Sequence, residues 1–247
     1  MDRLVTTALT AMRGAMGRQA TIANNLANAN TIGFRQEIAN ASSQYVDGQT
    51  FKSRVQQAEQ VISADMNKGA VTQTGNMLDV AMNGEAMLAV QADDGSEAYT
   101  RRGDLKLNDS GLLTTGDGKP VLGEGGPITL PAYDSLNIAQ DGSIWIVPQG
   151  GEASQPQRID ALKLVNPTGS TIAKGLDGLF REVNGGVAAQ DPLATVTSGA
   201  LEGSNVNATQ SLVQMIEASR SWETQIKMIN TAKDMDDGGA SLMRLDN

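Results

Sequence analysis

The amino-acid sequence predicts a mainly β protein of the α+β class, with long N- and C-terminal helices that pair as a coiled coil and a central all-β domain of many short strands. Two observations predict the helices. Apolar residues recur at seven-residue spacing near both ends, and all seven prolines fall between Pro120 and Pro192. A third observation predicts the β domain, because short alternating apolar runs between the ends are separated by Asn-Gly and Asp-Gly turn signals.

The first predicted helix starts near Asp2 and fades through an Asn-rich stretch to Gly33. Two rows of residues recur every seven positions along it, flanked by three further apolar residues. The rows are Val5, Met12, Gln19 and Leu26, then Ala8, Ala15, Ile22 and Ala29, and the flanking residues are Leu9, Met16 and Ala23. A seven-residue repeat is typical of helices that pack side by side. This helix is therefore expected to need a partner.

The second predicted helix occupies the C-terminal end, where no Gly or Pro occurs from Ser204 to Asp237. Asn207 followed by Gln210 resembles a capping box that starts the helix, and Gly238-Gly239 is expected to stop it. Its apolar residues follow a 3-4 spacing: Leu212, Met215, Trp222, Ile226 and Ile229. Trp222 could anchor the helix against neighbouring subunits or could be an intramolecular core residue; the length of the apolar seam favours the first.

The segment from Gln36 to Asn76 has mixed polarity and no clear period, although residues 53–66 could form a short helix. From Met77 onward the pattern changes to short strands with turns such as Asn83-Gly84 and Asp141-Gly142. The predicted division is an N-terminal helical part at 1–35, a connecting segment at 36–76, a β domain at 77–203 and a C-terminal helical part at 204–247.

The residue types exclude most catalytic chemistry. The chain has no cysteine and no histidine, which removes disulfides, thiolate nucleophiles, the usual zinc sites and His-based acid/base catalysis. The acidic clusters mostly adjoin glycines where a hairpin must turn, and none has the spacing of a calcium loop. No Ser-x-x-Lys pattern or phosphate-binding loop is present. We therefore expect no enzyme activity, no catalytic residues, no cofactor, no metal and no small-molecule substrate.

Charge and hydropathy narrow the possible partners. The net charge is −9, and the middle of the chain is acidic, which argues against nucleic acid because phosphate binding needs clustered Lys and Arg. No apolar run approaches the ~18 residues that cross a membrane, so a membrane-spanning protein is not expected. The first 30 residues lack the continuous apolar core of a cleaved signal peptide, which predicts either a cytosolic protein or export by another route.

Two terminal motifs carry a resemblance to a known family. The segment ANNLANANTIGFR, Ala23 to Arg35, closely resembles the N-terminal signature of the flagellar rod and hook protein family. The C-terminal signature is matched by Gly199-Ala200-Leu201-Glu202, by Ser204 to Asn207, and by MIEASRSWETQIKMI. LDVAMNGEAML, YTRRGDLKL, DSGLL and GKPVLG are similar to the family's core domain, so the resemblance covers nearly the whole chain. Met87-Leu88 stands where the family usually has an aromatic pair.

The resemblance implies a non-enzymatic subunit that leaves the cytoplasm through the flagellar type III export apparatus. It implies assembly with proximal- and distal-rod proteins in the periplasmic space, in the flagellum basal body, as a helical tube that transmits torque. The terminal helices would line the inner tube. The chain length and the segments PITLP and SLNIAQDGSIWI are similar to the proximal-rod branch. The alternatives are a distal-rod or hook subunit, or a secreted β-domain binding module that dimerises through its helices.

The expected site is an assembly interface at the two ends. Asn24, Asn25, Asn28 and Asn30 are poor helix formers, and we expect amide hydrogen bonds to neighbouring subunits rather than simple fraying into a Gly33 cap, mainly because of the resemblance. The predicted interface residues are Val5, Leu9, Met12, Met16, Ile22, Asn24, Asn25, Leu26, Asn28, Asn30, Gly33, Phe34, Ser204, Asn205, Val206, Asn207, Leu212, Met215, Ile216, Trp222, Ile226 and Ile229.

Overall fold

The fold is known from a computed structural model that describes residues 2–45, 55–150, 155–167, 172–175, 177–183 and 185–244, with side chains described, within these ranges, for 8–39 and 63–241. The chain divides into two compact units. The helical unit comprises Met1–Ala27, Glu37–Ser63 and Asn207–Asn247; the β unit comprises Asn28–Gln36 and Ala64–Val206. This grouping differs from the predicted division, because residues 28–36 belong with the strands and residues 37–63 with the helices.

Two helices form the bulk of the helical unit. Helix α1 spans Asp2–Ala27 and begins where the sequence predicts. Helix α2 spans Ala208–Arg244, and the side-chain oxygen of Asn207 accepts a hydrogen bond from the Gln210 N–H at 3.1 Å, as expected of a cap. The predicted stop at Gly238-Gly239 is wrong. Neither glycine has a positive φ, so no left-handed C-cap forms and the helix continues to Arg244.

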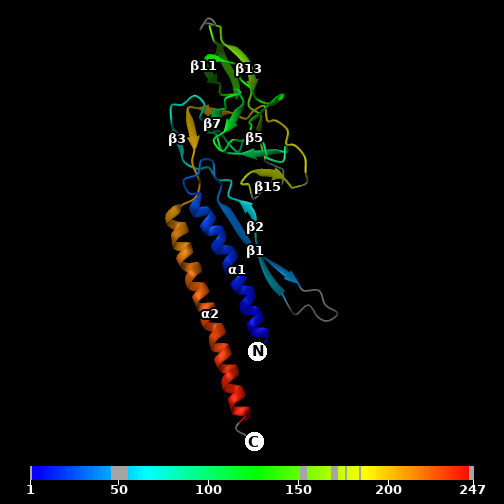
Figure 1. The fold of residues 1–247 in the computed structure, drawn as a ribbon, viewed down its shortest axis with the longest axis vertical. Coiled ribbons are helices and arrows are strands. Elements are labelled where there is room, and N and C mark those ends of the chain that lie inside the picture. The colour runs from blue at the N-terminus through cyan, green and yellow to red at the C-terminus, as the bar shows by residue number, and fades with distance from the viewer. Residues whose placement is uncertain are drawn as a thin grey trace. The chain divides into compact units, whose positions relative to one another are not determined.

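Helices α1 and α2 run in opposite directions and pack side by side (Figure 1). The less exposed residues of α2 recur at alternating spacings of four and three, which places them in one row along the helix. This row consists of Ser211, Met215, Ala218, Trp222, Gln225, Ile229 and Ala232. The buried residues described on α1 are Ala8, Ala15, Thr21 and Asn25. The side chains most deeply buried in the helix pair are therefore small or polar.

The described residues 37–45 and 55–64 form two paired strands that run in opposite directions, and these residues contain no helix (Figure 1). Strand β1 spans Glu37–Tyr45 and pairs with β2, Val55–Ala64. The expectation of a short helix at 53–66 is therefore wrong. Its Gln- and Ala-containing sequence is compatible with either structure, and pairing with β1 decides between them, because strand formation depends on the neighbouring strand more than on intrinsic preference.

The β unit contains the remaining strands, mostly two to six residues long. They are β3 Val71–Gln73, β4 Val80–Met82, β5 Met87–Gln91, β6 Glu97–Thr100, β7 Leu105–Leu107, β8 Leu113–Thr115, β9 Leu122–Gly123, β10 Gly126–Pro127, β11 Tyr133–Ile138, β12 Ser143–Pro148, β13 Gln157–Ala161, β14 Leu164–Val165, β15 Ile172–Lys174, β16 Phe180–Glu182, β17 Val196–Ser198 and β18 Ala200–Glu202. A mainly β protein with two terminal helices is thus confirmed for the described residues.

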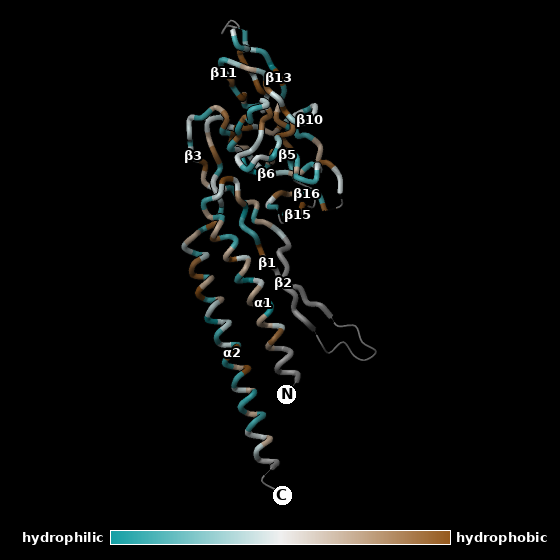
Figure 2. The backbone as a smooth tube through the Cα atoms, in the orientation of Figure 1, coloured by the Kyte–Doolittle hydropathy of each residue, from teal (hydrophilic) through white to brown (hydrophobic). Residues whose placement is uncertain are grey.

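The strands are antiparallel and form one five-stranded sheet, one three-stranded sheet and several two-stranded pairs. The orders of the larger sheets are β14-β5-β6-β16-β15 and β11-β12-β13. The five-stranded sheet is buried on both faces, because Leu88 and Val90 of β5 enter one apolar cluster while Met87 and Ala89 enter another. Figure 2 shows the apolar residues concentrated in these strands and interspersed with polar ones along the helices. Met87-Leu88, the departure from the family pattern, fills both faces of this sheet.

Of two hairpins predicted from Asn-Gly and Asp-Gly turns, one is present and one is absent. Asp141-Gly142 joins the paired strands β11 and β12 as predicted. Asn83-Gly84 also forms a turn, with φ +63° at Gly84, but the strands on either side do not pair with each other. Strand β4 pairs with β17, and β5 pairs with β6 and β14. The carbonyl groups around this turn instead bind the side chain of Arg101.

Candidate functional site: a clasp between the two signature segments

A buried ion triad joins three distant parts of the sequence within the β unit. Arg35, Arg101 and Glu202 are each at most 2% exposed. One guanidinium nitrogen of Arg35 lies 2.8 Å from one carboxylate oxygen of Glu202. Arg101 donates from Nε, at 2.9 Å, and from a second nitrogen to the other oxygen. Two positive charges therefore share one negative charge away from water.

The two arginines differ in how fully they are satisfied. Arg101 also donates to the backbone oxygens of Met82 at 3.0 Å, Gly84 at 3.1 Å and Ala86. Arg35 also donates to the Asn67 oxygen, but its buried Nε has no hydrogen-bond partner among the described residues. Burial lowers the pKa of the Arg35 guanidinium below its ordinary value; Glu202 opposes this effect and Arg101 adds to it. Arg35 is thus the less well satisfied of the two cations.

Gly33 allows the N-terminal signature to reach the triad. Its N–H donates to the Glu202 backbone oxygen at 2.8 Å, and its φ is +68°. A Cβ atom at this position would lie 2.4 Å from the backbone carbon of Arg101. Any other residue would meet both the left-handed backbone strain and a backbone clash, so the position requires glycine.

Asn205 fastens the same region from the C-terminal signature. Its side-chain oxygen accepts from the Gln36 N–H at 2.7 Å, and its amide nitrogen donates to the oxygens of Asp65 and Asn67 at 2.8 and 2.9 Å. Its own N–H donates to the Phe34 oxygen at 3.3 Å. One side chain therefore links residues 36, 65 and 67. We call residues 33–36, 65–67 and 202–205, together with Arg101, the clasp.

A lysine covers the clasp from β15. The ammonium nitrogen of Lys174 lies 3.6 Å from the centre of the Phe34 ring and 3.2 Å from the Arg35 backbone oxygen. The first contact has the geometry of a cation–π interaction. Phe34 is therefore in contact within its own chain in the β unit.

The asparagines of the N-terminal signature also have partners within the chain. In the helical unit, Asn25 is buried and exchanges hydrogen bonds with the Glu37 backbone, accepting at 2.8 Å and donating at 2.9 Å. The amide of Asn24 donates to the Glu37 carboxylate at 2.8 Å. In the β unit, the side-chain oxygen of Asn28 accepts from the Thr31 hydroxyl at 3.0 Å. Asn30 is exposed. The intersubunit role predicted for these four amides stays a prediction.

The predicted apolar interface separates into two sets. Met12, Ile22 and Leu26 of α1 and Met215, Trp222 and Ile229 of α2 are half-buried. Leu9 and Met16 of α1 and Leu212, Ile216 and Ile226 of α2 are exposed. The side chain of Val5 lies outside the described side chains. Ser204 accepts the Val206 N–H at 3.2 Å, and Val206 is buried in the β unit.

Sequence reasoning missed the charged members of the clasp. Arg35 and Glu202 lie inside the two signature segments, and Arg101 lies in YTRRGDLKL, so all three were within motifs that the resemblance singled out. None was predicted as a site residue, because charged side chains are mostly exposed and nothing in the local sequence indicates that these three are buried. An Arg-Arg-Gly run after a strand was the one available signal.

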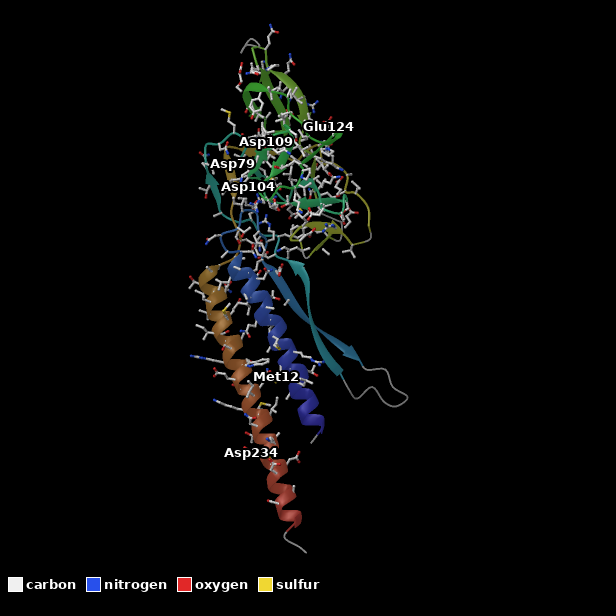
Figure 3. All side chains as sticks on the ribbon, viewed as in Figure 1. Met12, Asp79, Asp104, Asp109, Glu124 and Asp234 are labelled. Atoms are coloured by element: carbon white, nitrogen blue, oxygen red, sulfur yellow. The ribbon has the colours of Figure 1, made fainter. Side chains whose placement is uncertain are left out.

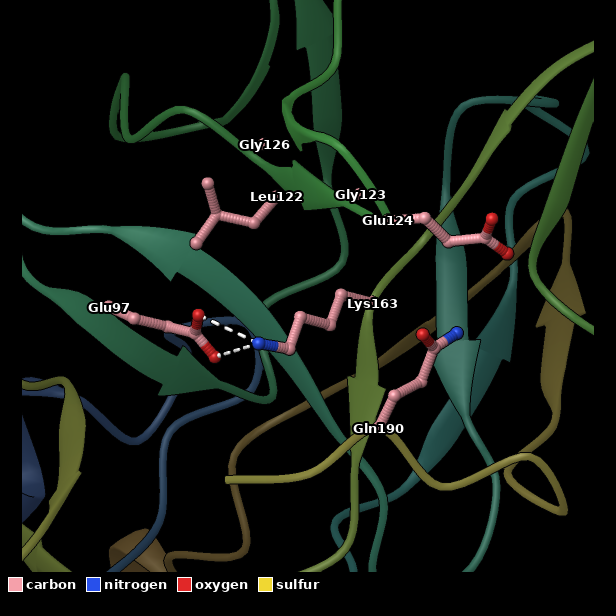
Figure 4. A pocket seen from close by; sticks show the side chains of 7 residues that line it. All are labelled: Glu97, Leu122, Gly123, Glu124, Gly126, Lys163 and Gln190. Carbon is pink, nitrogen blue, oxygen red and sulfur yellow. Dashed lines mark hydrogen bonds and ion pairs between the residues drawn. The ribbon is translucent and has the colours of Figure 1, made fainter. Parts of the chain in front are cut away.

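A separate pocket of about 390 Å³ lies in the β unit (Figure 4). It is lined by Glu97, Leu122, Gly123, Glu124, Gly126, Lys163 and Gln190. Its two innermost charges neutralise each other, because the Lys163 ammonium lies 2.7 and 2.8 Å from the two carboxylate oxygens of Glu97. Glu124 pairs with Arg158 at 2.9 Å. The lining is polar and its charged side chains are paired.

The acidic residues of the β unit act mainly as turn and ion-pair partners. Asp141 accepts from the Ser143 N–H and hydroxyl at 3.1 and 2.6 Å, and these bonds lower the pKa of its carboxyl group. Asp79, Asp104, Asp109 and Glu124 come from separate strands and turns (Figure 3). In the part of the chain that the structure describes, no cluster of three or more His, Cys, Asp or Glu side chains could hold a metal ion. Neither described helix is both long and apolar enough to cross a bilayer.

Three family models match successive parts of the chain. Residues 6–35 match "Flagella basal body rod protein", residues 81–146 match "Flagellar hook protein FlgE/F/G D1 domain", and residues 197–242 match "Flagellar basal body rod FlgEFG protein C-terminal". The first and third include the clasp residues Gly33, Arg35, Glu202 and Asn205.

Complete relatives are similar over almost their whole length. The flagellar basal-body rod protein FlgF of Escherichia coli is 40% identical over 240 residues, which covers 95% of each chain. FlgF of Salmonella typhimurium is 38% identical over 247 residues, covering 98% of each chain. The flagellar basal-body rod protein FlgG of Bacillus subtilis is 31% identical over 258 residues, covering 95% of this chain and 97% of that protein.

Proposed function

We infer the function from the family: the chain belongs to the FlgF family of flagellar basal-body rod proteins and is a structural subunit of the rod, and we propose that its terminal helices carry its assembly. The observation that carries the proposal is the exposed apolar surface of the helical unit. Leu9 and Met16 are 46% and 58% exposed, and Leu212 and Ile216 are 49% and 55% exposed. Large apolar side chains that share an exposed face indicate a protein contact.

The exposed residues of α2 share one face. At about 100° per residue, Leu212, Ile216 and Ile226 fall within roughly 80° of one another around the helix. Met215, Trp222 and Ile229, which alternate with them in sequence, fall on the side that packs against α1. The helix thus has two apolar faces, one covered within the chain and one uncovered.

We propose that the covered face forms an antiparallel coiled coil with α1 and that the uncovered face is completed by helices of neighbouring rod subunits. The 4-3 spacing of the half-buried residues supports the first part. For the second part, complete burial of each large apolar side chain would contribute about 1.5–3 kcal/mol, and less for one already half covered. Repeated around a helical tube, such contacts would resist torque.

The finer assignment follows the resemblance. We propose a place in the proximal rod, in the periplasmic space, among proximal- and distal-rod proteins. We further propose export by the flagellar type III apparatus without a cleaved signal peptide, and a role without catalysis. The similarity to FlgF proteins over nearly the whole chain supports the proximal place. The interrupted apolar pattern of the first 30 residues supports the export route.

A complementation experiment tests the assembly role. A strain lacking this gene would be complemented with Ile216→Asp, and swimming and the composition of purified hook–basal bodies would be measured. We expect loss of swimming and loss of the subunit from the particle, because a carboxylate at the uncovered face cannot be buried unpaired.

Ser221→Asp is the matched control. It places the same carboxylate on an exposed polar position of α2, about 140° around the helix from Ile216. We expect this variant to swim. Normal swimming and normal particles with Ile216→Asp, at equal protein level, would contradict the assignment of the interface.

A further inference from the structure

The clasp gathers the places at which the chain leaves the β unit. The chain passes between the two units after residues 27, 36, 63 and 206. The β-unit segments next to these points are 28–36, 64–67 and 203–206. The point after residue 36 adjoins the clasp directly, and the points after 63 and 206 are each separated from it by one residue. The point after residue 27 begins the short segment that ends in Arg35 and Gln36.

Several hydrogen bonds of the clasp join these segments to one another. Asn205 contacts residues 34, 36, 65 and 67, as described above, and the Asp65 N–H donates to the Gln36 oxygen at 2.7 Å. The Gly33 N–H donates to the Glu202 oxygen. Each segment is therefore held by the other two, and removal of one leaves buried backbone groups on its neighbours unpaired.

The closed arrangement of the clasp depends on Glu202, because its carboxylate is the negative charge that Arg35 and Arg101 share. With Glu202 in place, the buried triad carries one excess positive charge. Without its carboxylate, Arg35 and Arg101 would be two buried cations that repel each other, with the more distant Asp65 charge acting on Arg35. Arg101 keeps its three backbone acceptors in that case, whereas Arg35 keeps only the Asn67 oxygen. The Arg35 side of the clasp is thus the side that would release.

The larger apolar cluster of the β unit has no member in the three clasp segments. The smaller cluster is in contact with them, because Ala64 and Met66 pack against it. Core strands are bonded among themselves, as where the Leu113 N–H donates to the Ile128 oxygen at 2.9 Å and the Ile128 N–H to the Val121 oxygen at 3.0 Å. The clasp therefore has its own set of interactions beside the core.

We propose that the clasp is a release device: residues 28–36, 64–67 and 203–206 open together as one cooperative unit, on separation of Arg35 from Glu202, while the core of the β unit stays folded. In the closed clasp, these segments are held by the hydrogen bonds and the ion pair described above. Release of the clasp frees several residues at each crossing. The clasp thus sets how much free chain links the two units, and this inference does not depend on the assembly role of the helices.

Amide hydrogen exchange of the full chain, followed residue by residue by NMR, tests the proposal. In Glu202→Gln we expect the N–H groups of Gly33, Gln36, Asp65 and Asn205 to exchange faster by a common factor of about tenfold or more, because charge-assisted bonds are lost. The N–H groups of Leu113, Val121 and Ile128 should keep their rates. In Glu124→Gln, which removes an exposed ion pair with Arg158, all of these rates should stay unchanged.

If Glu202→Gln does not fold, a second measurement on the unaltered protein tests the same proposal. In the unaltered protein, exchange would be followed in increasing low concentrations of denaturant. The clasp amides should converge on one opening transition that precedes the opening of the core amides. Core amides that accelerate with the clasp amides, or clasp amides that respond by unrelated factors, would overturn the proposal in either experiment.

Discussion

The two units of this protein bury opposite kinds of side chain. In the β unit, Leu88 and Ile144 are completely buried, and charged groups as large as Arg101 are enclosed with partners. In the helical unit, the fully buried residues are small or polar, such as Ala15 and Asn25, while Ile216 is 55% exposed. Most large apolar side chains of the β unit are therefore buried within the chain, although Val183, Val187 and Leu193 are exposed. In the helical unit, Leu9, Met16 and Leu212 are exposed as well, and we propose that neighbouring rod subunits cover this surface.

The strongest test of the self-contained β unit is Arg101→Met. We expect the free energy of unfolding to fall by about 3–5 kcal/mol, because three buried backbone oxygens lose their donor, at roughly 1–3 kcal/mol each, while Glu202 keeps Arg35 as its partner. Urea denaturation would be followed by Trp145 fluorescence in a Trp222→Phe background. Arg158→Met, which removes an exposed partner of Glu124, should cost about 0–1 kcal/mol. Equal costs for the two variants would contradict the buried role of Arg101.

A pair of leucines compares the units directly. Leu88→Ala removes a side chain that is 0% exposed, and should lower the free energy of unfolding by about 2–5 kcal/mol. Leu212→Ala removes one that is 49% exposed, and in the monomer should change it by no more than about 0.5 kcal/mol. Both would be measured by urea denaturation. A large decrease in the free energy of unfolding for Leu212→Ala would mean that Leu212 is packed within the helical unit of the monomer.

Substitution of Gly33 tests the clasp, with a smaller expected change in the free energy of unfolding. Gly33→Ala should destabilise the protein by more than the roughly 1–2 kcal/mol of left-handed backbone strain, since its Cβ would also meet the Arg101 backbone. Gly95 has φ +80° and no atom within 4 Å of a built Cβ, so Gly95→Ala isolates the strain alone. Thermal unfolding of both variants gives the comparison. A Gly33→Ala cost equal to that of Gly95→Ala would argue against the close approach.

The pH dependence of the β unit gives the smallest effect. Burial raises the pKa of Tyr99 to about 12, although its oxygen accepts the Ala188 N–H at 2.6 Å. The unfolded chain loses this proton near pH 10 and the folded chain does not, so the contribution is constant below pH 10 and stability falls as pH rises from 10 toward 12. Denaturation midpoints at pH 9 and 11 would measure this fall. Tyr99→Phe should reduce it, and an undiminished fall would assign it to other groups.

Local patterns predicted the elements well where one rule decides the outcome. The start of α1 at Asp2, the Asn207 cap and the Asp141-Gly142 hairpin follow from nearby residues alone. The Asn83-Gly84 hairpin failed because Arg101, distant in sequence, binds the carbonyl groups of that turn. The Gly238-Gly239 stop failed because two glycines weaken a helix without ending it unless one adopts the left-handed conformation.

The sequence motifs contain the clasp residues, but the charged contacts among them were not predicted, and the predicted assembly interface stays a prediction. The signatures place Gly33 and Asn205 among the important residues, but nothing in the sequence shows that they meet. Arg35, Arg101 and Glu202 are separated by 66 and 101 positions, and only the folded β unit brings their charges together. The 3-4 seam of α2 likewise could not reveal that Met215 and Ile216, adjacent in sequence, lie on a covered and an uncovered face.

The central claim is that the uncovered face of the helical unit is covered in the rod. Because the chain has no cysteine, Ile216→Cys supplies a single thiol, and its reaction rate with a maleimide can be compared in the purified monomer, in purified hook–basal bodies and in denatured particles. The account predicts rapid labelling of the monomer and the denatured particle, and strong protection in the intact particle. Labelling of the intact particle as fast as the monomer would contradict it.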